Sequence, residues 1–299
     1  MILIVGEGML ELAVRDGGGW QMGYGGDTLN TAIHLARLGR QVAFVTALGD
    51  DPFSQRLRDD WTAEGVDLSL VRTDRAKRPA LYAITTDDQG ERSFTYWRSD
   101  SAARRMFALG DNADLLAADT DLLYFSMITL AILPPEGRET LFDWCAQVRA
   151  RGGRVAFDSN YRPALWESGE AARTAHARGM ALADIGLPTR EDEQQLTGLD
   201  DPAAIAAQWR EAGVGEVVVK MGGEGCFADG ELRPVPAKIV PVDTTGAGDS
   251  FNAGYLHARL GGASVADSVI AGHRLAGFVI MRRGGVPAVT DDAPYAGLC

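Results

Sequence analysis

The chain is poor in cysteine and histidine. Its 299 residues include three cysteines and four histidines, all far apart in the sequence. This spacing gives no disulfide framework and no metal-ligand pattern, and no histidine has the partner pattern of a catalytic group. We therefore expect a reducing, cytoplasmic setting and look elsewhere for catalytic residues. The residues concerned are Cys145, Cys226 and Cys299, and His34, His176, His257 and His273.

A long apolar run, a signal peptide and a basic surface are missing as well. The longest apolar run, at 122–133, is too short to span a bilayer. The first residues, Met1 to Glu7, lack a basic region and predict a buried strand instead of a signal peptide. With 29 Lys and Arg against 41 Asp and Glu, the net charge is −12, which disfavours binding to nucleic acid or to an anionic membrane. We expect neither as a partner.

Strand-like and helix-like patterns alternate along most of the chain. Short apolar runs predict buried strands, and apolar residues at helical spacing before glycine stops predict helices. This alternation is typical of an α/β fold with a mainly parallel sheet covered by helices on both faces. We predict a single domain over residues 1–299. The predicted strands are 2–5, 42–47, 122–125, 155–158 and 216–220, and the predicted helices lie at about 29–36, 53–61, 140–150, 203–212, 250–260 and 265–282.

Two segments depart from this alternation. Residues 80–86 and 92–98 are β-like runs joined by turn-forming residues at 87–91, which predicts a hairpin. The glycine-rich segment at 10–24 is also β-like. We predict a small β-lid built from about residues 10–24 and 80–98. Such a short lid, with Tyr82, Phe94 and Trp97, leaves sheet edges open, so we expect a homodimer formed through the lids.

The most specific motif is the stretch DTTGAGDSF at 243–251. A turn of small residues, Gly246-Ala247-Gly248, comes directly before Asp249 and an apolar helical segment. Unpaired N–H groups at such a helix start bind phosphate. A carboxylate there would repel phosphate, so Asp249 is suited to removing a proton from a hydroxyl that attacks phosphorus. The alternative is an ordinary helix cap in a tight turn.

This stretch resembles the C-terminal signature of the ribokinase-like (PfkB) carbohydrate kinases. The resemblance implies a ribokinase-like fold that binds ATP. It also implies that Asp249 is the catalytic base, and that the amides of Gly246, Ala247, Gly248 and Asp249 form the anion hole beside the ATP phosphates.

The second motif, GGDTLN at 25–30, leads from two glycines into a helix. For Asp27 alone a helix cap is an adequate explanation, whereas Asn30 is a mediocre helix former. The stretch resembles the N-terminal signature of the same family. The resemblance places Gly26, Asp27 and Asn30 at the sugar site.

The third motif lies on the predicted hairpin, where Tyr96 and Arg98 share one face by the period of two. A guanidinium binds a planar carboxylate in bidentate fashion, which a neutral sugar would not require. The alternative is an exposed strand edge on which Arg98 discourages aggregation. Within the PfkB family this run resembles the 2-keto-3-deoxygluconate kinases. That resemblance implies that Tyr82, Tyr96 and Arg98 contact a sugar acid.

Two further motifs follow strand ends, where ligands gather in an open parallel sheet. DSNYRP at 158–163 resembles the family pattern Asp-x-Asn-x-Arg, which places Asn160 beside the nucleotide and Arg162 near the sugar acid or the transferred phosphate. KMGGEG at 220–225 resembles a segment beside ATP and adds Lys220, Gly222 and Gly225. Each motif alone also fits a surface loop. No Walker-type phosphate loop occurs.

One position departs from the family pattern. Many relatives carry Asn-x-x-Glu before a Leu-Thr-Gly, tied to magnesium and phosphate, whereas this chain has Thr189 and Asp192 at these positions. Asp192 keeps a hard oxygen ligand for Mg²⁺, which we expect to be bound through water. Glu191 is the competing ligand.

Together these resemblances imply an ATP- and Mg²⁺-dependent kinase that phosphorylates the terminal 6-hydroxyl of 2-keto-3-deoxy-D-gluconate. The rival within the family is a fructokinase or another neutral-sugar or nucleoside kinase, against which Tyr96 and Arg98 argue. The rival from another class is a non-catalytic sugar-acid sensor on a kinase fold. Asp249 argues against that rival, because a pure binder needs no base.

Overall fold

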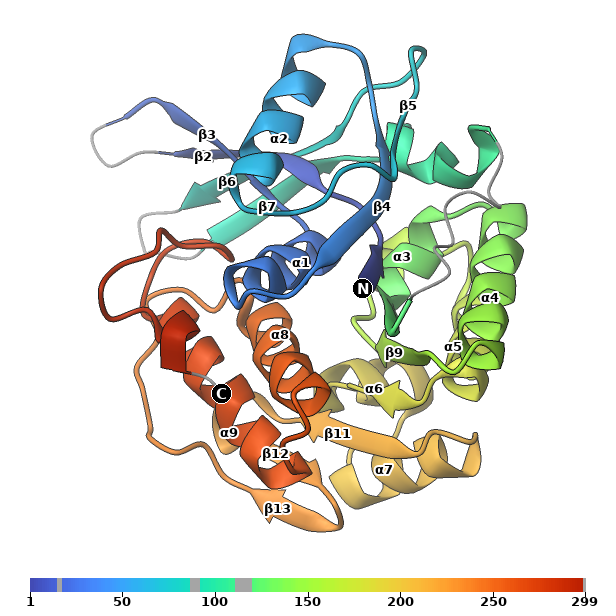
Figure 1. Ribbon diagram of the computed structural model, residues 1–299, viewed down its shortest axis with the longest axis vertical. Coiled ribbons are helices and arrows are strands. Elements are labelled where there is room, and N and C mark those ends of the chain that lie inside the picture. Colours follow the sequence, from blue (N-terminus) through green and yellow to red (C-terminus); the bar gives the residue numbers. More distant parts are fainter. Residues whose placement is uncertain (15–17, 87–91, 111–119, 298–299) are drawn as a thin grey trace.

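A nine-stranded sheet runs through the middle of the molecule (Figure 1). The computed structural model describes residues 1–14, 18–86, 92–110 and 120–297. Within them the strand order is β13-β12-β11-β10-β9-β8-β1-β4-β5, and all neighbours pair in parallel except β11 with β12 and β12 with β13. The strands are β1 (Ile2–Val5), β4 (Val42–Leu48), β5 (Val71–Thr73), β8 (Leu122–Ser126), β9 (Arg154–Asp158), β10 (Ile185–Gly186), β11 (Glu216–Lys220), β12 (Cys226–Ala228) and β13 (Glu231–Arg233).

Helices cover both faces of this sheet because its central strands are apolar on both sides. Successive residues of β1 belong to different cores: Ile2 and Ile4 pack on one face, and Leu3 and Val5 on the other. The first face carries α1 (Asp27–Arg37), α2 (Pro52–Ala63), α8 (Ala247–Leu260) and α9 (Val265–Ile280). The second carries α3 (Met127–Ile132), α4 (Pro135–Ala150), α5 (Gly169–Leu182), α6 (Arg190–Thr197) and α7 (Pro202–Glu211). Short 3₁₀ helices are η1 (Ala102–Ala108), η3 (Pro163–Leu165), η4 (Gly222–Glu224) and η5 (Pro294–Gly297).

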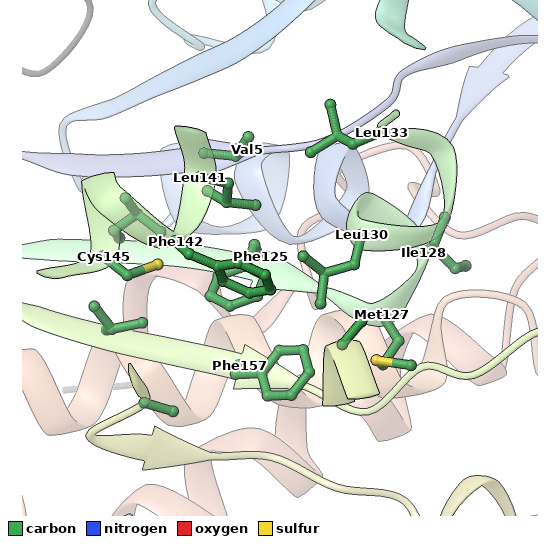
Figure 2. Packing of buried hydrophobic residues seen from close by; sticks show 14 of the residues in the cluster. Val5, Phe125, Met127, Ile128, Leu130, Leu133, Leu141, Phe142, Cys145 and Phe157 are labelled. Carbon is green, nitrogen blue, oxygen red and sulfur yellow. The ribbon is translucent and has the colours of Figure 1, made fainter. Parts of the chain in front are cut away.

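The core of the second face is built around stacked aromatic rings (Figure 2). The rings of Phe125 on β8 and Phe157 on β9 lie 4.8 Å apart, and Trp209 of α7 stacks on Phe157 at 5.5 Å. All three side chains are fully buried. Burial of each such side chain stabilises the fold by about 1.5–3 kcal/mol. The strands that deliver residues to the cavity described below are therefore held rigidly.

The helices differ in how they begin. The side chains of Asp51, Ser168, Asp201 and Ser264 cap α2, α5, α7 and α9 by accepting bonds from first-turn amides. Helices α1, α6 and α8 have no side-chain cap. All three begin at the carboxyl ends of the central strands, where their first-turn amides remain available to a ligand.

A second sheet forms the lid, in the order β3-β2-β6-β7. Its strands are β2 (Met9–Val14), β3 (Trp20–Gly25), β6 (Ala80–Thr86) and β7 (Arg92–Trp97). Strand β2 pairs antiparallel with β3 and parallel with β6, which pairs antiparallel with β7. In Figure 1 this sheet extends to the left above α1. The predicted hairpin strands are confirmed, while its turn at 87–91 and residues 15–17 lie outside the described residues.

The predicted mainly parallel sheet with helices on both faces is confirmed. The main boundary difference is at α4, which begins at Pro135 and not near residue 140, because Pro135 at its first position suits a helix start. Helix α8 begins at Ala247 and not at residue 250, so Asp249 lies inside its first turn. The short elements β5, β10, β12, β13, α3 and α6 give too few residues for periodicity to detect. No helix of the described residues is long and apolar enough to cross a bilayer.

Candidate active site

A cavity of about 1250 Å³ opens at the carboxyl ends of the central strands, between the lid and the starts of α1, α6 and α8. Every residue that the sequence motifs singled out lines it. These residues are Gly26, Asp27, Asn30, Tyr82, Tyr96, Arg98, Asn160, Arg162, Asp192, Lys220, Gly222, Gly225, Gly246, Ala247, Gly248 and Asp249. Five motifs and the segment at 189–192, spread over more than two hundred residues of sequence, therefore meet at one site.

Asp249 lies in the uncapped first turn of α8 and is 8% exposed. Asn30 Nδ2 donates to its Oδ2 at 2.8 Å, and Thr31 Oγ1 donates to its carbonyl at 3.2 Å. Burial raises the pKa of Asp249 to about 8, the negative charge of Asp27 adds to this, and the bond from Asn30 opposes it. A carboxyl group with such a pKa accepts a proton readily near neutral pH. The alternative of an N-cap is wrong, because Gly246 occupies the cap position.

Gly246 is required by the geometry of this turn. Its φ of 73° lies in the left-handed region, and a Cβ there would come within 2.6 Å of the Gly285 Cα. Glycine avoids both penalties. The amides at the start of α8 can then face the cavity with no side chain covering them.

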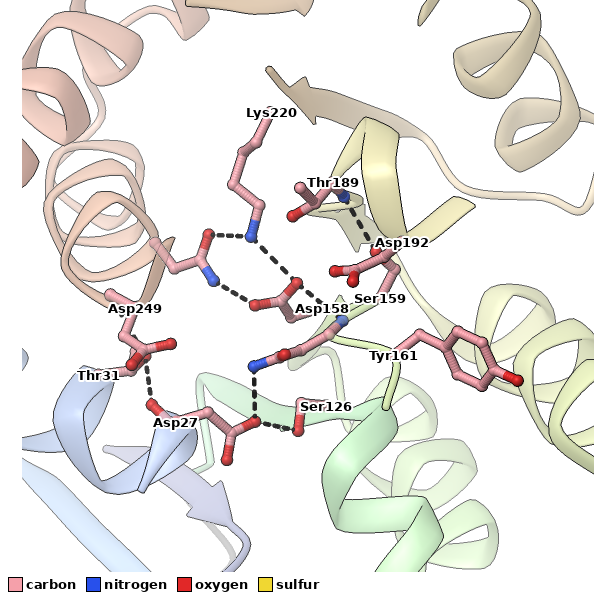
Figure 3. A network of polar contacts seen from close by, with 12 residues as sticks. Asp27, Thr31, Ser126, Asp158, Ser159, Tyr161, Thr189, Asp192, Lys220 and Asp249 are labelled. Carbon is pink, nitrogen blue, oxygen red and sulfur yellow. Dashed lines mark hydrogen bonds and ion pairs between the residues drawn. The ribbon is translucent and has the colours of Figure 1, made fainter. Parts of the chain in front are cut away.

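Asp27 begins α1 but is not its cap, so the helix-cap explanation is wrong here too, since Gly26 is the cap residue. Its Oδ2 accepts bonds from Ser126 Oγ at 2.5 Å and from Asn160 Nδ2 at 3.2 Å (Figure 3). Burial raises the pKa of the Asp27 carboxyl group. Asn30 Oδ1 and Asn160 Oδ1 are buried and accept no bond within the described chain. Both acceptors are available to the hydroxyls of a ligand.

A buried polar network lies close to the first turn of α8, and sequence reasoning identified only Lys220 in it. Lys220 Nζ donates to Asp158 Oδ1 at 3.0 Å and to Asn252 Oδ1 at 3.1 Å. Asn252 Nδ2 in turn donates to Asp158 Oδ2 at 2.7 Å. A Cβ on Gly248 would lie 3.8 Å from Lys220 Nζ, so this ammonium group lies close to the first turn of α8. Asp158, which ends β9 in Figure 3, had a detectable signal as the first residue of its motif.

On the lid side, Arg98 is already paired with a carboxylate that the sequence did not reveal. Its Nε donates to Glu7 Oε2 at 2.9 Å and its Nη2 lies 2.7 Å from the same oxygen. Arg98 is 9% exposed and Glu7 1%. The Cζ of Arg98 lies 5.8 Å from the centre of the Tyr96 ring, and Tyr82 Oη donates to Glu11 Oε2 at 2.5 Å. The only sequence signal for Glu7 was a carboxylate directly after a buried strand.

Arg162 and Asp192 face each other across the cavity mouth. Arg162 Nη1 donates to Asp192 Oδ1 at 3.2 Å, and 55% of the Arg162 side chain is exposed. Burial raises the pKa of Asp192 to about 7, while the charge of Arg162 opposes the shift. The described residues hold no group of three or more metal-ligating side chains. Mg²⁺ commonly uses one or two carboxylates with phosphate oxygens and water, which the buried Asp192 fits better than Glu191, whose side chain is 53% exposed.

Glycines of the KMGGEG segment line the opposite end of the cavity, together with a loop that no motif indicated. Gly225 has a φ of 111°, and a Cβ there would lie 2.1 Å from the Arg233 carbonyl oxygen. Residues 235–241 and one face of α9 complete this end. Most of that loop is exposed. We refer to it as the open end, and to the part lined by Asp27, Asn30, Tyr96 and Arg98 as the lid end.

Comparisons with known proteins agree with this geometry. A family model described as pfkB family carbohydrate kinase matches residues 4–292. The 2-dehydro-3-deoxygluconokinase of Dickeya dadantii (strain 3937) is 44% identical over 299 residues, covering 95% of this chain and 96% of that protein. A fructokinase of Klebsiella pneumoniae is 31% identical over 90% of this chain and 87% of its own. The crystal structure of a PfkB protein from Polaromonas sp. JS666 is 30% identical, with a TM-score of 0.82 and 96% of each chain covered.

Proposed function

The chain belongs to the pfkB family of carbohydrate kinases, and from that premise we propose that it transfers the γ-phosphoryl group of ATP to the terminal 6-hydroxyl of 2-keto-3-deoxy-D-gluconate. The products are 2-keto-3-deoxy-6-phosphogluconate and ADP. The observation that carries the proposal is the position of Asp249, a buried carboxyl group with a pKa raised to about 8, in one cavity with Arg98. The high identity to 2-dehydro-3-deoxygluconokinases supports the same substrate.

In the proposed reaction, Asp249 acts as the base for transfer of the phosphoryl group. Asp249 accepts the proton of the 6-hydroxyl, the hydroxyl oxygen bonds to the γ-phosphorus, and the bond from phosphorus to the ADP oxygen breaks. The amides at the start of α8 and the Lys220 ammonium stabilise the charge on the transferring group. Asn30 Oδ1 offers an unpartnered acceptor to a sugar hydroxyl.

The carboxylate of the sugar acid would contact Arg98, Tyr96 and Tyr82 on the lid and Arg162 at the mouth of the cavity. Mg²⁺, which Asp192 would hold through water, would neutralise the phosphate oxygens of ATP. Asn160, Gly222 and Gly225 would lie beside the nucleotide.

A neutral-sugar kinase is the rival that one observation favours. The charge of Arg98 is already balanced by Glu7, and a fructokinase is among the relatives. A non-catalytic sensor is disfavoured, because a binder gains nothing from a buried base such as Asp249.

ADP release, measured by a coupled assay with and without the sugar acid, distinguishes an enzyme from a sensor. Mass spectrometry of the product should show one added phosphoryl group on C6, and ADP release that does not respond to the sugar acid would contradict the proposal.

We also propose that residues 1–299 form one kinase domain with its lid, and that two copies pair through the lids. Trp97 is 58% exposed and Trp20 54%, an unusual exposure for such large rings. Sedimentation of Trp97→Ser should give the monomer where the wild type gives a dimer.

Cys145 and Cys226 are free and buried, which agrees with the reducing cytoplasm that we propose.

A further inference from the structure

We propose that Glu7 is a positioning residue for Arg98, and that it sets the preference of this site for a carboxylate substrate. The proposal rests on the proposed function, because it concerns how the lid end recognises the acid. It adds a residue that no sequence motif indicated. Glu7 itself does not line the cavity, so it would act through Arg98 and not by touching the substrate.

The first observation is that the carboxylate of Glu7 is held from two sides. Oε2 accepts from Arg98 Nε at 2.9 Å and lies 2.7 Å from Nη2. Oε1 accepts from Ser101 Oγ at 2.5 Å. The Glu7 side chain is completely buried and that of Arg98 is 9% exposed, so water does not compete for these bonds. A buried group held in this way has one orientation.

The second observation is that the pairing with Glu7 leaves one edge of the Arg98 guanidinium available to a ligand. Glu7 occupies the edge formed by Nε and Nη2, whereas Nη1 donates no hydrogen bond within the part of the chain that the structure describes. Because Arg98 lines the cavity, its remaining donors are the ones that a substrate carboxylate can reach. A guanidinium fixed before binding loses less side-chain entropy when the ligand arrives.

The third observation is that Glu7 lies in the short connection, residues 6–8, between β1 of the central sheet and β2 of the lid. Arg98, in contrast, follows the last lid strand, β7, so the ion pair joins this connection to the far edge of the lid. A Cβ on Gly26 would lie 2.2 Å from the Glu7 carbonyl oxygen, so the same backbone also packs against the start of α1. The guanidinium is thereby fixed relative to Asp27 and Asn30, which lie on α1.

A purely structural ion pair is the competing explanation, since a buried pair often contributes specificity of fold and nothing more. The chain offers a matched control in Glu216, which accepts from Arg259 Nη2 at 2.7 Å and from Tyr255 Oη at 2.6 Å. This glutamate also joins a strand to another element through an arginine and a hydroxyl. None of the three residues lines the cavity.

The experiment compares Glu7→Asp with Glu216→Asp. Each change keeps the charge and withdraws the carboxylate by one methylene group. For Glu7→Asp we expect kcat/KM for 2-keto-3-deoxygluconate to fall about tenfold, mainly through KM, while kcat/KM for a slow neutral substrate such as fructose changes by less than about twofold. Glu216→Asp should leave the ratio of the two substrates unchanged. An equal loss for both substrates in Glu7→Asp would overturn the proposal.

Chemical rescue provides a second test. Arg98→Ala should regain sugar-acid turnover when guanidinium is added at non-denaturing concentration, because Glu7, held in place by Ser101, would bind the free cation. In the double variant Glu7→Gln/Arg98→Ala the site carries no unpaired buried charge, so the protein should fold, yet guanidinium should give no rescue. Equal rescue in both variants would overturn the proposal. Since Glu7→Asp keeps both charges, that comparison does not depend on the folding of Arg98→Ala.

The substrate preference of the wild-type protein distinguishes a failure of this proposal from a failure of the proposed function. If the wild type phosphorylates the sugar acid and Glu7→Asp shows no selective loss, only the role of Glu7 is wrong. If the wild type turns over fructose faster than the sugar acid, the proposed function itself is wrong, and the selective effect of Glu7 falls with it.

Discussion

The two ends of the cavity are built in different ways. At the lid end, the charged side chains are buried and joined in pairs, Arg98 with Glu7 and Asp27 with Ser126, while Tyr96 is 50% exposed. At the open end, glycine backbone and an exposed loop at 235–241 form the wall. Fixed side chains can distinguish one sugar from another, whereas backbone amides bind any phosphate. We infer that substrate selectivity lies at the lid end and general nucleotide binding at the open end.

The largest effect should come from the residue between the two ends. Asp249→Asn keeps the shape of the side chain but cannot accept a proton, so kcat should fall by about 10²–10⁴. Nucleotide affinity, measured by calorimetry, should stay within about twofold, because the amides of α8 are unchanged. A variant that keeps more than about a tenth of the wild-type kcat would show that Asp249 is not the base.

The two arginines provide the next test of the comparison. Arg98→Leu leaves the buried carboxylate of Glu7 without its positive partner and should lower the free energy of unfolding by about 3–5 kcal/mol. The exposed Arg162 should contribute less than about 1 kcal/mol. For the sugar acid, Arg98→Leu should also reduce kcat/KM by about 10–150-fold, the equivalent of 1.5–3 kcal/mol for a charged hydrogen bond. Urea unfolding and steady-state kinetics of Arg98→Leu and of the corresponding Arg162→Leu variant measure these losses of stability and activity. Equal losses of stability in the two variants would contradict the expected difference between the buried and the exposed arginine.

At the open end, backbone geometry should matter more than side-chain identity. Gly225→Ala places a Cβ against the Arg233 carbonyl at a positive φ and should cost about 1–3 kcal/mol of stability. Gly223→Ala meets nothing within 4 Å and should change stability by less than about 0.5 kcal/mol. We expect the Michaelis constant for ATP to rise in Gly225→Ala, with the ratio of sugar-acid to fructose turnover unchanged. A changed ratio would contradict the division between the two ends.

A further test concerns pH. Because the pKa of Asp249 is raised to about 8 in the folded protein, kcat/KM should increase with pH up to an inflection near that value. The folded state holds a proton that the unfolded chain has already released, so this group lowers the stability of the fold as pH rises from about 4 to about 8. Asn cannot ionise. The melting temperature of Asp249→Asn should therefore exceed that of the wild type by a margin that grows with pH, and a constant margin would mean that the carboxyl group is not perturbed.

Much of the fold follows from local sequence. The mainly apolar runs at 2–5, 122–125 and 155–158 become central strands because both faces of the sheet are covered. Strands β6 and β7 were detectable as β-like runs joined by turn-forming residues, whereas β2 and β3 were detectable only as one β-like, glycine-rich segment. The short strand β10 was not, because two residues carry no periodicity, and its place is determined by pairing with β9 and β11.

The site was predictable where a motif carries its own chemistry, as with Gly246 and Asp249. It was not predictable where function depends on a distant partner. Glu7 and Arg98 are 91 residues apart, and nothing local to either residue indicates that they meet. Lys220 could be assigned to the nucleotide end from its glycines, but its bonds to Asp158 and Asn252 arise only when three separate segments fold together.

The most direct test of this account is the substrate preference of the wild-type protein. Initial rates with ATP should be measured for 2-keto-3-deoxygluconate, 2-keto-3-deoxygalactonate, fructose and ribose under identical conditions. We predict that kcat/KM for 2-keto-3-deoxygluconate exceeds that for fructose and ribose by at least about tenfold, since a charged contact at Arg98 is available only to the acid. A kcat/KM for fructose or ribose equal to or greater than that for the sugar acid would contradict the account.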